Sequence, residues 1–254
     1  MDSEQTLEDL YEKYNISNLS YGKRSDALGD LYEEYTKNIF TSEDVWRKYN
    51  SKAPAETTME KVFHSTLQPY GITAVKTVEV VPVPCRKSGG EPKTDVHLRI
   101  NGAVDIKLSV KQSHSNNVTV AEFSADTICD EGGIGDAEAA RLLEKHQKDA
   151  SAKLFTADEK SDLKRRLSPF KKKLVKWVLS GSPDESSTDT RIANHTIMFK
   201  VDSRCFRLRD FSSYTIEEQV NKILEGRAGF GTGLSWTYAT GSKGKRIQFK
   251  CPVL

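Results

Sequence analysis

Residues 94–111 read TDVHLRINGAVDIKLSVK, and this stretch decides the fold. Apolar and polar residues alternate over Asp95–Ile100 and again over Val104–Lys111, which predicts two strands. Asn101-Gly102 lies between them and is a strong hairpin signal, because both residues tolerate the positive φ of a type I′ turn. A third alternating run, Val118–Phe123, predicts that the hairpin continues into a β-meander.

Helices and further strands are expected around this meander. Ser25 is expected to cap the second helix, and Ser168-Pro169 to supply the N-cap and first position of another. The segments RKSGGE at 86–91 and GSPDESSTDT at 181–190 are expected to be loops. Apolar periodicity predicts helices at 3–14, 25–40, 56–69, 137–155, 160–167, 169–179 and 216–224, and strands at 75–83, 192–201, 205–208, 234–239 and 245–250.

These elements predict a mixed α/β fold with a central, mainly antiparallel mixed β-sheet flanked by helices. We expect one domain over residues 1–254. Its parts would be an N-terminal helical region at about 1–70, the sheet at about 75–125 and a C-terminal hairpin at about 226–254.

The composition is that of a soluble globular protein that can bury a substantial core, with 254 residues, 37% of them hydrophobic and 29% charged. No apolar run approaches the roughly 20 residues of a membrane span, and the acidic N-terminus lacks a secretory h-region. We therefore expect a cytoplasmic protein. The four cysteines form no C-x-x-C pair and the five histidines are dispersed, which argues against a zinc site.

Positive charge is concentrated in two places. No acidic residue follows Gly226, whereas Arg227, Lys243, Lys245, Arg246 and Lys250 are basic. A second basic run lies between Lys164 and Lys176. One-sided positive charge favours a polyanionic partner such as duplex DNA, although the run at 164–176 fits a solvated helix face equally well.

The hairpin carries a pattern typical of nucleases. Cleavage of a phosphodiester needs a cation, a carboxylate that holds it and a group that positions water. Many nucleases place an Asp on one strand and an acidic-x-Lys triplet on the next. Here Asp95 is followed by two candidate triplets, Asp105-Ile106-Lys107 and Ser109-Val110-Lys111.

The hairpin geometry favours the second triplet. With the turn at Asn101-Gly102, the residue opposite Asp95 lies near 108 or 109. Asp105 would lie about 10 Å away along the strand, which one Mg²⁺ ion cannot bridge. Ser109 and Lys111 are within reach and share a face. Asp105 stays as the alternative second metal residue, because it supplies the acid that the pattern asks for.

Over nearly its whole length the chain resembles the MspI-type restriction endonucleases, type II enzymes of the PD-(D/E)xK nuclease superfamily. The C-terminal block is the longest and most specific part of the resemblance. The motifs that carry it are Ser25-Asp26-x-Leu28-Gly29-x-Leu31-Tyr32-Glu33, Pro92-Lys93-Thr94-Asp95, Val118–Glu122, Thr127-Ile128-Cys129, Lys145-His146-Gln147, Ser151–Thr156, Gly229–Lys243 and Gln248-Phe249-Lys250.

The resemblance implies a Mg²⁺-dependent enzyme that cuts duplex DNA at C-C-G-G after the first C, leaving 5′ overhangs with 5′-phosphate ends. The family's catalytic Asp and Lys fall on Asp95 and Lys111, and its catalytic Asn falls on Ser109, which is a departure. A cognate DNA methyltransferase is the implied functional partner. The resemblance also implies an enzyme that acts as a monomer or weak dimer.

The C-terminal block predicts a DNA-reading hairpin. Gln248 and Lys250 share one strand face, where Lys can donate to guanine O6 and N7. Glu122 can accept from the N4 amino group of cytosine. By resemblance, base contacts fall on Thr119, Glu122, Thr237, Thr240, Gln248 and Lys250. Two other functions stay open: another nuclease of the same superfamily with a different site, and a sequence-specific DNA-binding protein without catalysis.

Overall fold

The computed structural model describes residues 3–85, 92–183 and 188–253, and the side chains of residues 3–5, 21 and 240 are not described. Its residues group into two compact units, Met1–Ser115 with Asp189–Thr215 and Asn116–Thr188 with Ile216–Leu254. The expected single domain stays a prediction. The expected loop at 86–91 lies outside the described residues, as do residues 184–187 of the second loop. No described helix is long and apolar enough to cross a membrane.

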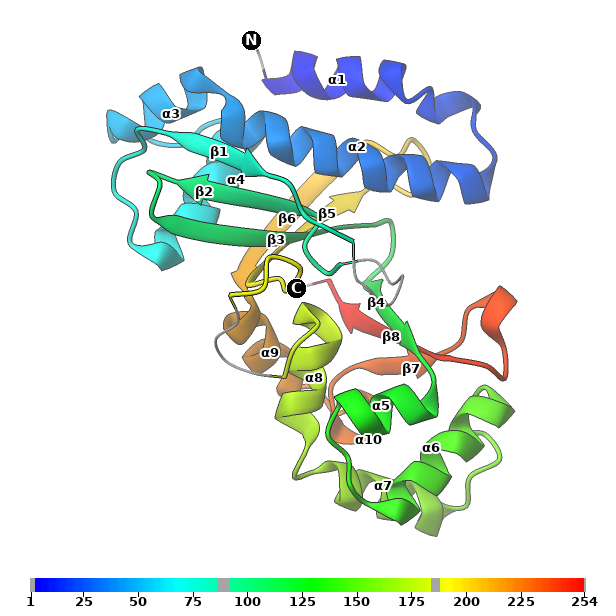
Figure 1. Cartoon of the computed structure of the whole chain (residues 1–254). Helices are drawn as coiled ribbons and strands as arrows, with labels where there is room; N and C mark the ends of the chain where they lie inside the picture. The colour runs from blue at the N-terminus through cyan, green and yellow to red at the C-terminus, as the bar shows by residue number, and fades with distance from the viewer. Residues whose placement is uncertain (1–2, 86–91, 184–187, 254) are drawn as a thin grey trace. The chain divides into compact units, whose positions relative to one another are not determined.

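The first unit is built on a five-stranded sheet (Figure 1). Every neighbouring pair is antiparallel except β3 and β5, which are parallel, so the expected mainly antiparallel mixed sheet is confirmed. In sheet order the strands are β1 (Val78–Val81), β2 (Val96–Ile100), β3 (Val104–Ser113), β5 (His195–Val201) and β6 (Leu208–Thr215).

Four α-helices belong to this unit: α1 (Ser3–Lys13), α2 (Tyr21–Thr41), α3 (Glu43–Asn50) and α4 (Thr58–Leu67), with 3₁₀ turns η1 (Ile16–Asn18) and η2 (Gln68–Tyr70). The apolar face of α2 packs on the sheet, where the ring of Tyr32 stacks on Phe199 with 4.7 Å between centroids. The predicted cap at Ser25 is wrong. Helix α2 begins four residues earlier, after the extended Ser20, and Ser25 lies inside it.

The predicted Asn101-Gly102 turn is confirmed. Both residues have positive φ, 54° and 68°, as a type I′ turn requires. The side chain of Asn101 also accepts from the backbone N–H of Lys76 at 2.7 Å and donates to the carbonyl of Ala74 at 2.9 Å. These bonds fasten the turn to the chain before β1, so the hairpin register is fixed at its tip.

The second unit holds a separate three-stranded antiparallel sheet, in the order β4 (Asn117–Phe123), β8 (Ile247–Pro252), β7 (Ser235–Thr237). The predicted meander is therefore wrong at its third strand. The free edge of β3 is taken by β5, and β4 pairs with the C-terminal strand instead. Around the sheet lie α5 (Ala125–Glu131), α6 (Ala137–Asp149), α7 (Ala157–Leu167), α8 (Lys171–Ser180), α9 (Ile216–Leu224), α10 (Ala228–Gly231) and η3 (Thr240–Ser242).

Three further local predictions differ from the structure. Helix α6 ends at Asp149 because Ala150 turns left-handed, with φ 56°. Helix α8 begins at Lys171 after Phe170, so Ser168-Pro169 does not cap it. Of the expected strand at 205–208 only Leu208 lies in a strand, where β6 begins. Asp202 holds the turn before it by accepting from the backbone N–H groups of Arg204 and Cys205.

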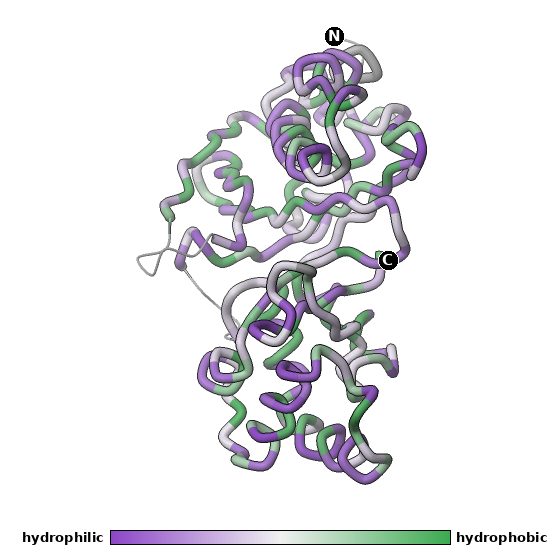
Figure 2. Tube along the Cα trace, turned by 90° about the vertical axis from the view of Figure 1, so that its right-hand side faces the viewer, coloured by the Kyte–Doolittle hydropathy of each residue, from purple (hydrophilic) through white to green (hydrophobic). Residues whose placement is uncertain are grey.

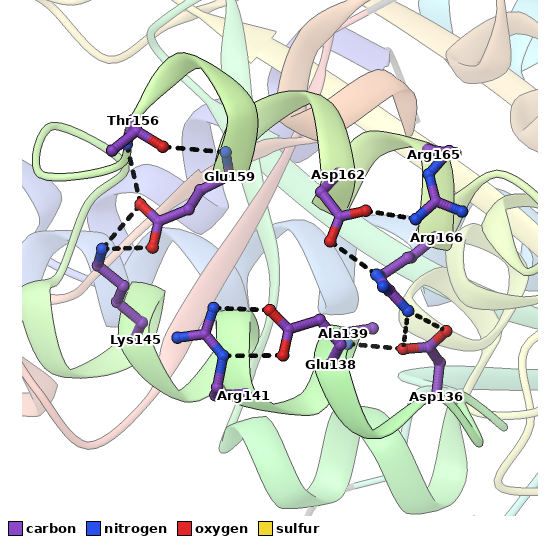
Figure 3. A network of polar contacts seen from close by, with 10 residues as sticks. All are labelled: Asp136, Glu138, Ala139, Arg141, Lys145, Thr156, Glu159, Asp162, Arg165 and Arg166. Carbon is purple, nitrogen blue, oxygen red and sulfur yellow. Dashed lines mark hydrogen bonds and ion pairs between the residues drawn. The ribbon is translucent and has the colours of Figure 1, made fainter.

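Ion pairs join α6 to α7 and neutralise part of the basic run (Figure 3). Arg166 donates to Asp136 at 2.8 Å and to Asp162 at 2.8 Å. Lys145 pairs with Glu159 at 2.7 Å, and Glu159 also closes a capping box with Thr156. Hydrophilic residues alternate with hydrophobic ones along the helices of both units, as amphipathic helices require (Figure 2).

Candidate active site and nucleic-acid interface

The first unit brings Asp95, Ser109 and Lys111 together at the open end of the β2–β3 hairpin. Val96 pairs with Leu108, and the backbone N–H of Asp95 donates to the carbonyl of Leu108 at 2.8 Å. Asp95 thus enters the sheet one residue before β2, beside Ser109. This is the position that the sequence geometry predicted.

The carboxylate of Asp95 is the centre of this cluster. Its Oδ2 accepts from Lys111 Nζ at 2.8 Å, from the backbone N–H of Val110 at 2.7 Å and from Ser109 Oγ at 3.5 Å. Lys111 Nζ donates in addition to the carbonyl of Val110 at 3.0 Å. Among the described residues every hydrogen bond to the Asp95 carboxylate ends on Oδ2.

The alternative triplet lies elsewhere on the hairpin. Asp105 pairs with Arg99 in the strand register, near the turn, and its Oδ1 is 3.0 Å from Arg99 Nε and 3.1 Å from His97 Nε2. Burial acts to raise the pKa of Asp105, but its bonds to Arg99 and His97 outweigh burial and lower it. Lys107 donates from Nζ to the carbonyl of Asp189 at 3.0 Å. Asp105 therefore joins a structural ion cluster away from Asp95.

Glu33 is a further acidic residue of this site that residue-level sequence reasoning did not single out. It lies on α2, which packs on β3, and it interacts electrostatically with both Asp95 and Lys111. Burial and then the negative charge of Asp95 raise the pKa of Glu33 to about 7, against the opposing effect of Lys111. Nothing local distinguishes Glu33 from its exposed-face neighbours on the helix; its place in the Tyr32-Glu33 motif of the resemblance was the available signal.

The donor set suits a hard cation better than a soft one. Within the described residues no group of three His, Cys, Asp or Glu side chains could hold a metal ion by itself. Asp95 and Glu33 nevertheless offer carboxylate oxygens, and Ser109 offers a hydroxyl. Mg²⁺ is bound through one or two carboxylates plus water and substrate phosphate, so this small set of oxygen ligands fits it.

The second unit gathers five of the six predicted base-reading residues on one sheet. On the central strand β8, Gln248 pairs in register with Glu122 of β4 on one side and with Thr237 of β7 on the other. Lys250 pairs with Thr119 across the first of these edges. A register shift between Thr119 and Ala121 marks a bulge in β4.

Glu122 is the acceptor at the centre of this second cluster. Gln248 Nε2 donates to Glu122 Oε1 at 2.6 Å, and Ser242 Oγ donates to Glu122 Oε2 at 3.2 Å. Thr240 begins η3, the turn that contains Ser242. On β8, Ile247 and Phe249 alternate with Gln248 and Lys250 and are fully buried. Gln248 is nearly buried, with 8% of its surface exposed, although it lies on the face of β8 that was expected to be exposed to solvent.

The known proteins to which this chain is similar are type II restriction enzymes. The sequence model of a family described as restriction endonuclease MspI matches residues 9–251. The type II restriction enzyme MspI of Moraxella sp is 34% identical to this chain, over 97% of the chain and 98% of the relative. The type II restriction enzyme BsuFI of Bacillus subtilis is 24% identical over 92% of the chain, which spans 61% of that relative.

A solved structure is similar over almost the whole chain. It is the crystal structure of restriction endonuclease MspI in complex with its cognate DNA. The TM-score is 0.83 at 31% sequence identity, with 96% of this chain and 97% of the other covered. Both the sequence and the fold are thus similar to one group of proteins from end to end.

Proposed function

Because the chain belongs to the MspI family of type II restriction endonucleases, we propose that it hydrolyses duplex DNA at C-C-G-G with Mg²⁺ as cofactor. The proposed cut follows the first C and leaves 5′ overhangs with 5′-phosphate ends. Support comes from the 34% identity to MspI of Moraxella sp and from the likeness to an MspI structure that contains its cognate DNA.

The observation that carries the proposed chemistry is the contact of Lys111 Nζ with Asp95 Oδ2 at 2.8 Å, with Ser109 beside it. A carboxylate, a hydroxyl and an ammonium group on adjacent strands are the parts that metal-assisted hydrolysis requires. A lysine that served only to bind DNA would be expected on the phosphates, whereas Lys111 is held against the carboxylate of Asp95.

In the proposed mechanism Asp95 and Ser109 would hold the cation, and the carboxylate of Glu33 interacts electrostatically with Asp95. When bound, Mg²⁺ supplies charge neutralisation at the phosphate and lowers the pKa of its water. Lys111 is oriented by Asp95 and by the carbonyl of Val110, so its ammonium can position the attacking water and donate to a phosphate oxygen. A serine hydroxyl is a weaker ligand than the family's amide oxygen, so we expect weaker cation binding than with Asn.

We propose that the sheet of the second unit reads the bases in the major groove. Lys250 is assigned to guanine O6 and N7, and Glu122 to the N4 amino group of cytosine. The hydroxyl residues Thr119, Thr237 and Thr240 complete the proposed contacts. The supporting observation is that Thr119, Glu122, Thr237, Gln248 and Lys250 lie in register on three adjacent strands.

Two partners follow from this function. An enzyme that cuts so short a palindrome would cut the DNA of its own cell, so we propose a cognate DNA methyltransferase that modifies the same site. We also propose that the chain acts on duplex DNA as a monomer or weak dimer.

Digestion of a sequenced plasmid with Mg²⁺ tests the proposal, with the cut ends mapped. We expect 5′ overhangs at every C-C-G-G and no digestion in EDTA. Defined ends at another sequence would refute the recognition site while keeping the nuclease. Specific binding without cutting in Mg²⁺ would refute the enzyme and favour a DNA-binding protein.

A further inference from the structure

The chain just before Asp95 is held by the backbone carbonyl of Arg191. The N–H groups of Lys93 and Thr94 donate to this carbonyl at 3.0 Å and 3.3 Å. Asp95 follows directly and enters the sheet through its own N–H bond to the carbonyl of Leu108. The position of Asp95 is therefore set from two sides, by the hairpin register on one side and by Arg191 on the other.

Asp189 fixes the direction of the Arg191 carbonyl. Its own carbonyl accepts from the N–H of Ile192 at 3.2 Å, and that N–H lies in the same planar peptide group as the carbonyl of Arg191. Its carboxylate accepts from the backbone N–H of Arg191 at 2.9 Å, from Arg191 Nε at 2.9 Å and from Nη2 at 2.6 Å. These bonds to Arg191 lower the pKa of Asp189 to about 2. A two-pronged pair of this kind is directional as well as strong, so it locks the turn.

The same turn is tied to β3, the strand that carries Ser109 and Lys111. Lys107 of β3 is 6% exposed, and its Nζ donates to the carbonyl of Asp189 at 3.0 Å. Asn194 binds the backbone of Lys107 twice. It donates its N–H to the Lys107 carbonyl at 2.9 Å and accepts the Lys107 N–H through Oδ1 at 2.7 Å. The lysine of the alternative triplet therefore connects β3 to this turn.

The segment from Asp189 to Asn194 thus joins the two stretches of chain whose separation defines the proposed cation site. One stretch leads into Asp95, and the other leads into Ser109. Mg²⁺ demands near-ideal ligand geometry at about 2.0–2.1 Å, so a small shift of either stretch weakens its binding. Groups that hold metal ligands in place are commonly worth 10-fold to 100-fold in metal affinity or activity.

We propose that Asp189, Arg191 and Lys107 are positioning residues of the active site, which hold Asp95 and Ser109 at the separation that cation binding requires. The proposal rests on the proposed function, because the cation site belongs to that function. The three residues act through Asp95 and Ser109 and not on the DNA. Their loss should therefore affect cation binding and the rate of the chemical step, and it should leave DNA affinity unchanged.

Four variants remove these contacts in steps. Asp189→Asn and Arg191→Gln break the ion pair from either side, a double variant combines them, and Lys107→Met removes the ammonium group while keeping an apolar chain. Asp202→Asn is the matched control. Asp202 also accepts from two backbone N–H groups and from an arginine, Arg209, but it holds the turn before β6.

Four measurements separate positioning from folding. Single-turnover cleavage is followed over a range of Mg²⁺ concentrations, and DNA affinity is measured in EDTA. Hydrogen exchange at the amides of Lys93 and Thr94 reports on the bonds to Arg191 without any cation or DNA. Urea unfolding shows how much of each variant is folded under the conditions of the assay.

We expect Asp189→Asn and Arg191→Gln each to raise the Mg²⁺ concentration for half-maximal cleavage by about 10-fold, and to slow cleavage at saturating Mg²⁺ by about 10-fold. The amides of Lys93 and Thr94 should exchange faster in both. The double variant should be no worse than either single variant, because the pair is broken only once. Arg191→Lys, which keeps the charge but not the two-pronged geometry, should recover part of the loss.

The other two variants are expected to differ from these. Lys107→Met should raise the Mg²⁺ requirement through β3, with a smaller effect on the amides of Lys93 and Thr94. Asp202→Asn should cut like the natural chain at every Mg²⁺ concentration. DNA affinity in EDTA should be the same for all variants.

Natural cleavage kinetics in folded variants whose Lys93 and Thr94 amides exchange faster would overturn the proposal, because the turn would then be structural only. A loss confined to DNA affinity would also overturn it, since Arg191 would then act on the DNA. So would an equal loss in Asp202→Asn. If the natural chain is folded but does not cut DNA in Mg²⁺, the proposed function fails and takes this proposal with it. An active natural chain with unaffected variants overturns this proposal alone.

Discussion

At the scale of single residues, the two ends of the Asp95–Lys111 contact have different tasks. Asp95→Ala removes the proposed cation ligand, and Lys111→Ala removes the ammonium that positions water. We expect each change to lower the cleavage rate by roughly 10²–10⁴-fold. Affinity for the site should change little, because the proposed base contacts lie on other strands. Cleavage and filter binding of the same duplex check both statements.

Exposed residues on α2 provide matched controls for these changes. Asp26→Ala and Lys23→Ala remove the same charges from exposed positions of the same unit and should leave the cleavage rate as it is. Full cutting by Asp95→Ala or by Lys111→Ala would show that the hairpin cluster is not the catalytic centre.

The second cation ligand is decided by comparing Ser109→Ala with Asp105→Asn. We expect Ser109→Ala to raise the Mg²⁺ concentration needed for half-maximal cleavage, because it removes an oxygen beside Asp95. Asp105→Asn should leave this concentration unchanged, since Asp105 binds Arg99 and His97. Titration of Mg²⁺ at fixed ionic strength gives the answer. The reverse ranking would assign the site to the Asp105 triplet.

The predicted and the missed residues of the active site differ in how far apart they are along the chain. Asp95, Ser109 and Lys111 are joined by one tight turn, so strand geometry alone places them opposite one another. Glu33 reaches the same cluster only because α2 packs across β3. That packing depends on the whole core of the unit. A local pattern in the sequence cannot encode it.

At the scale of elements, His146 makes the stability of α6 and its surroundings depend on pH. The ring is buried among Phe155, Phe230 and Trp236. Burial lowers the pKa of His146 from 6.5 to about 4. The unfolded chain therefore binds a proton at a pH where the folded chain does not. Stability from this group is complete above pH 6.5 and is lost as the pH falls toward 4.

This shift corresponds to about 3 kcal/mol of unfolding free energy across that pH range. His146→Phe should flatten the dependence between pH 6.5 and pH 4, even if its stability at neutral pH differs from that of the natural chain. Urea unfolding at several pH values measures the slope. An unchanged slope in the variant would show that His146 is accessible to protons in the folded state.

The loop before β7 depends on glycine at Gly233. This residue has φ 80°, and a Cβ there would meet the backbone carbonyl of Ile223 in α9. We expect Gly233→Ala to lower the unfolding free energy by about 2 kcal/mol or more, from strain and from the displaced contact. Gly241→Ala has open space and should have little effect. Chemical denaturation of both variants tests this; equal stability would contradict the close approach.

Elements specified by local signals were predicted well, and those specified by distant partners were not. The Asn101-Gly102 turn and the helix Ile216–Leu224 were correct because their residues determine them locally. The departure of β4 to a second sheet could not be foreseen, since any alternating strand can pair with either edge. Helices α3 and α5 are short, with eight and seven residues, and gave too little periodicity.

At the scale of the whole molecule, the two basic regions differ in how far their charge is already neutralised. In the run at 164–176, Arg165 and Arg166 bind Asp162, and Lys172 binds Glu217 at 2.5 Å. Within the described residues, Lys245 and Arg246 have no such acidic partner. Lys245 and Arg246 should therefore contribute more to the long-range field that attracts DNA than Arg165, Arg166 and Lys172 do.

This difference predicts unequal effects on the salt dependence of DNA binding. Each phosphate contact adds about 0.9 to the slope of log affinity against log salt concentration. Lys245→Ala and Arg246→Ala should each reduce that slope by roughly 1, whereas Lys172→Ala should leave it nearly unchanged because Glu217 already offsets its charge. Binding measured in EDTA from 50 to 300 mM salt, on specific and nonspecific duplexes, separates the two regions. A slope that falls with Lys172→Ala alone would assign DNA binding to the helical run and leave the C-terminal charges as a solvated surface.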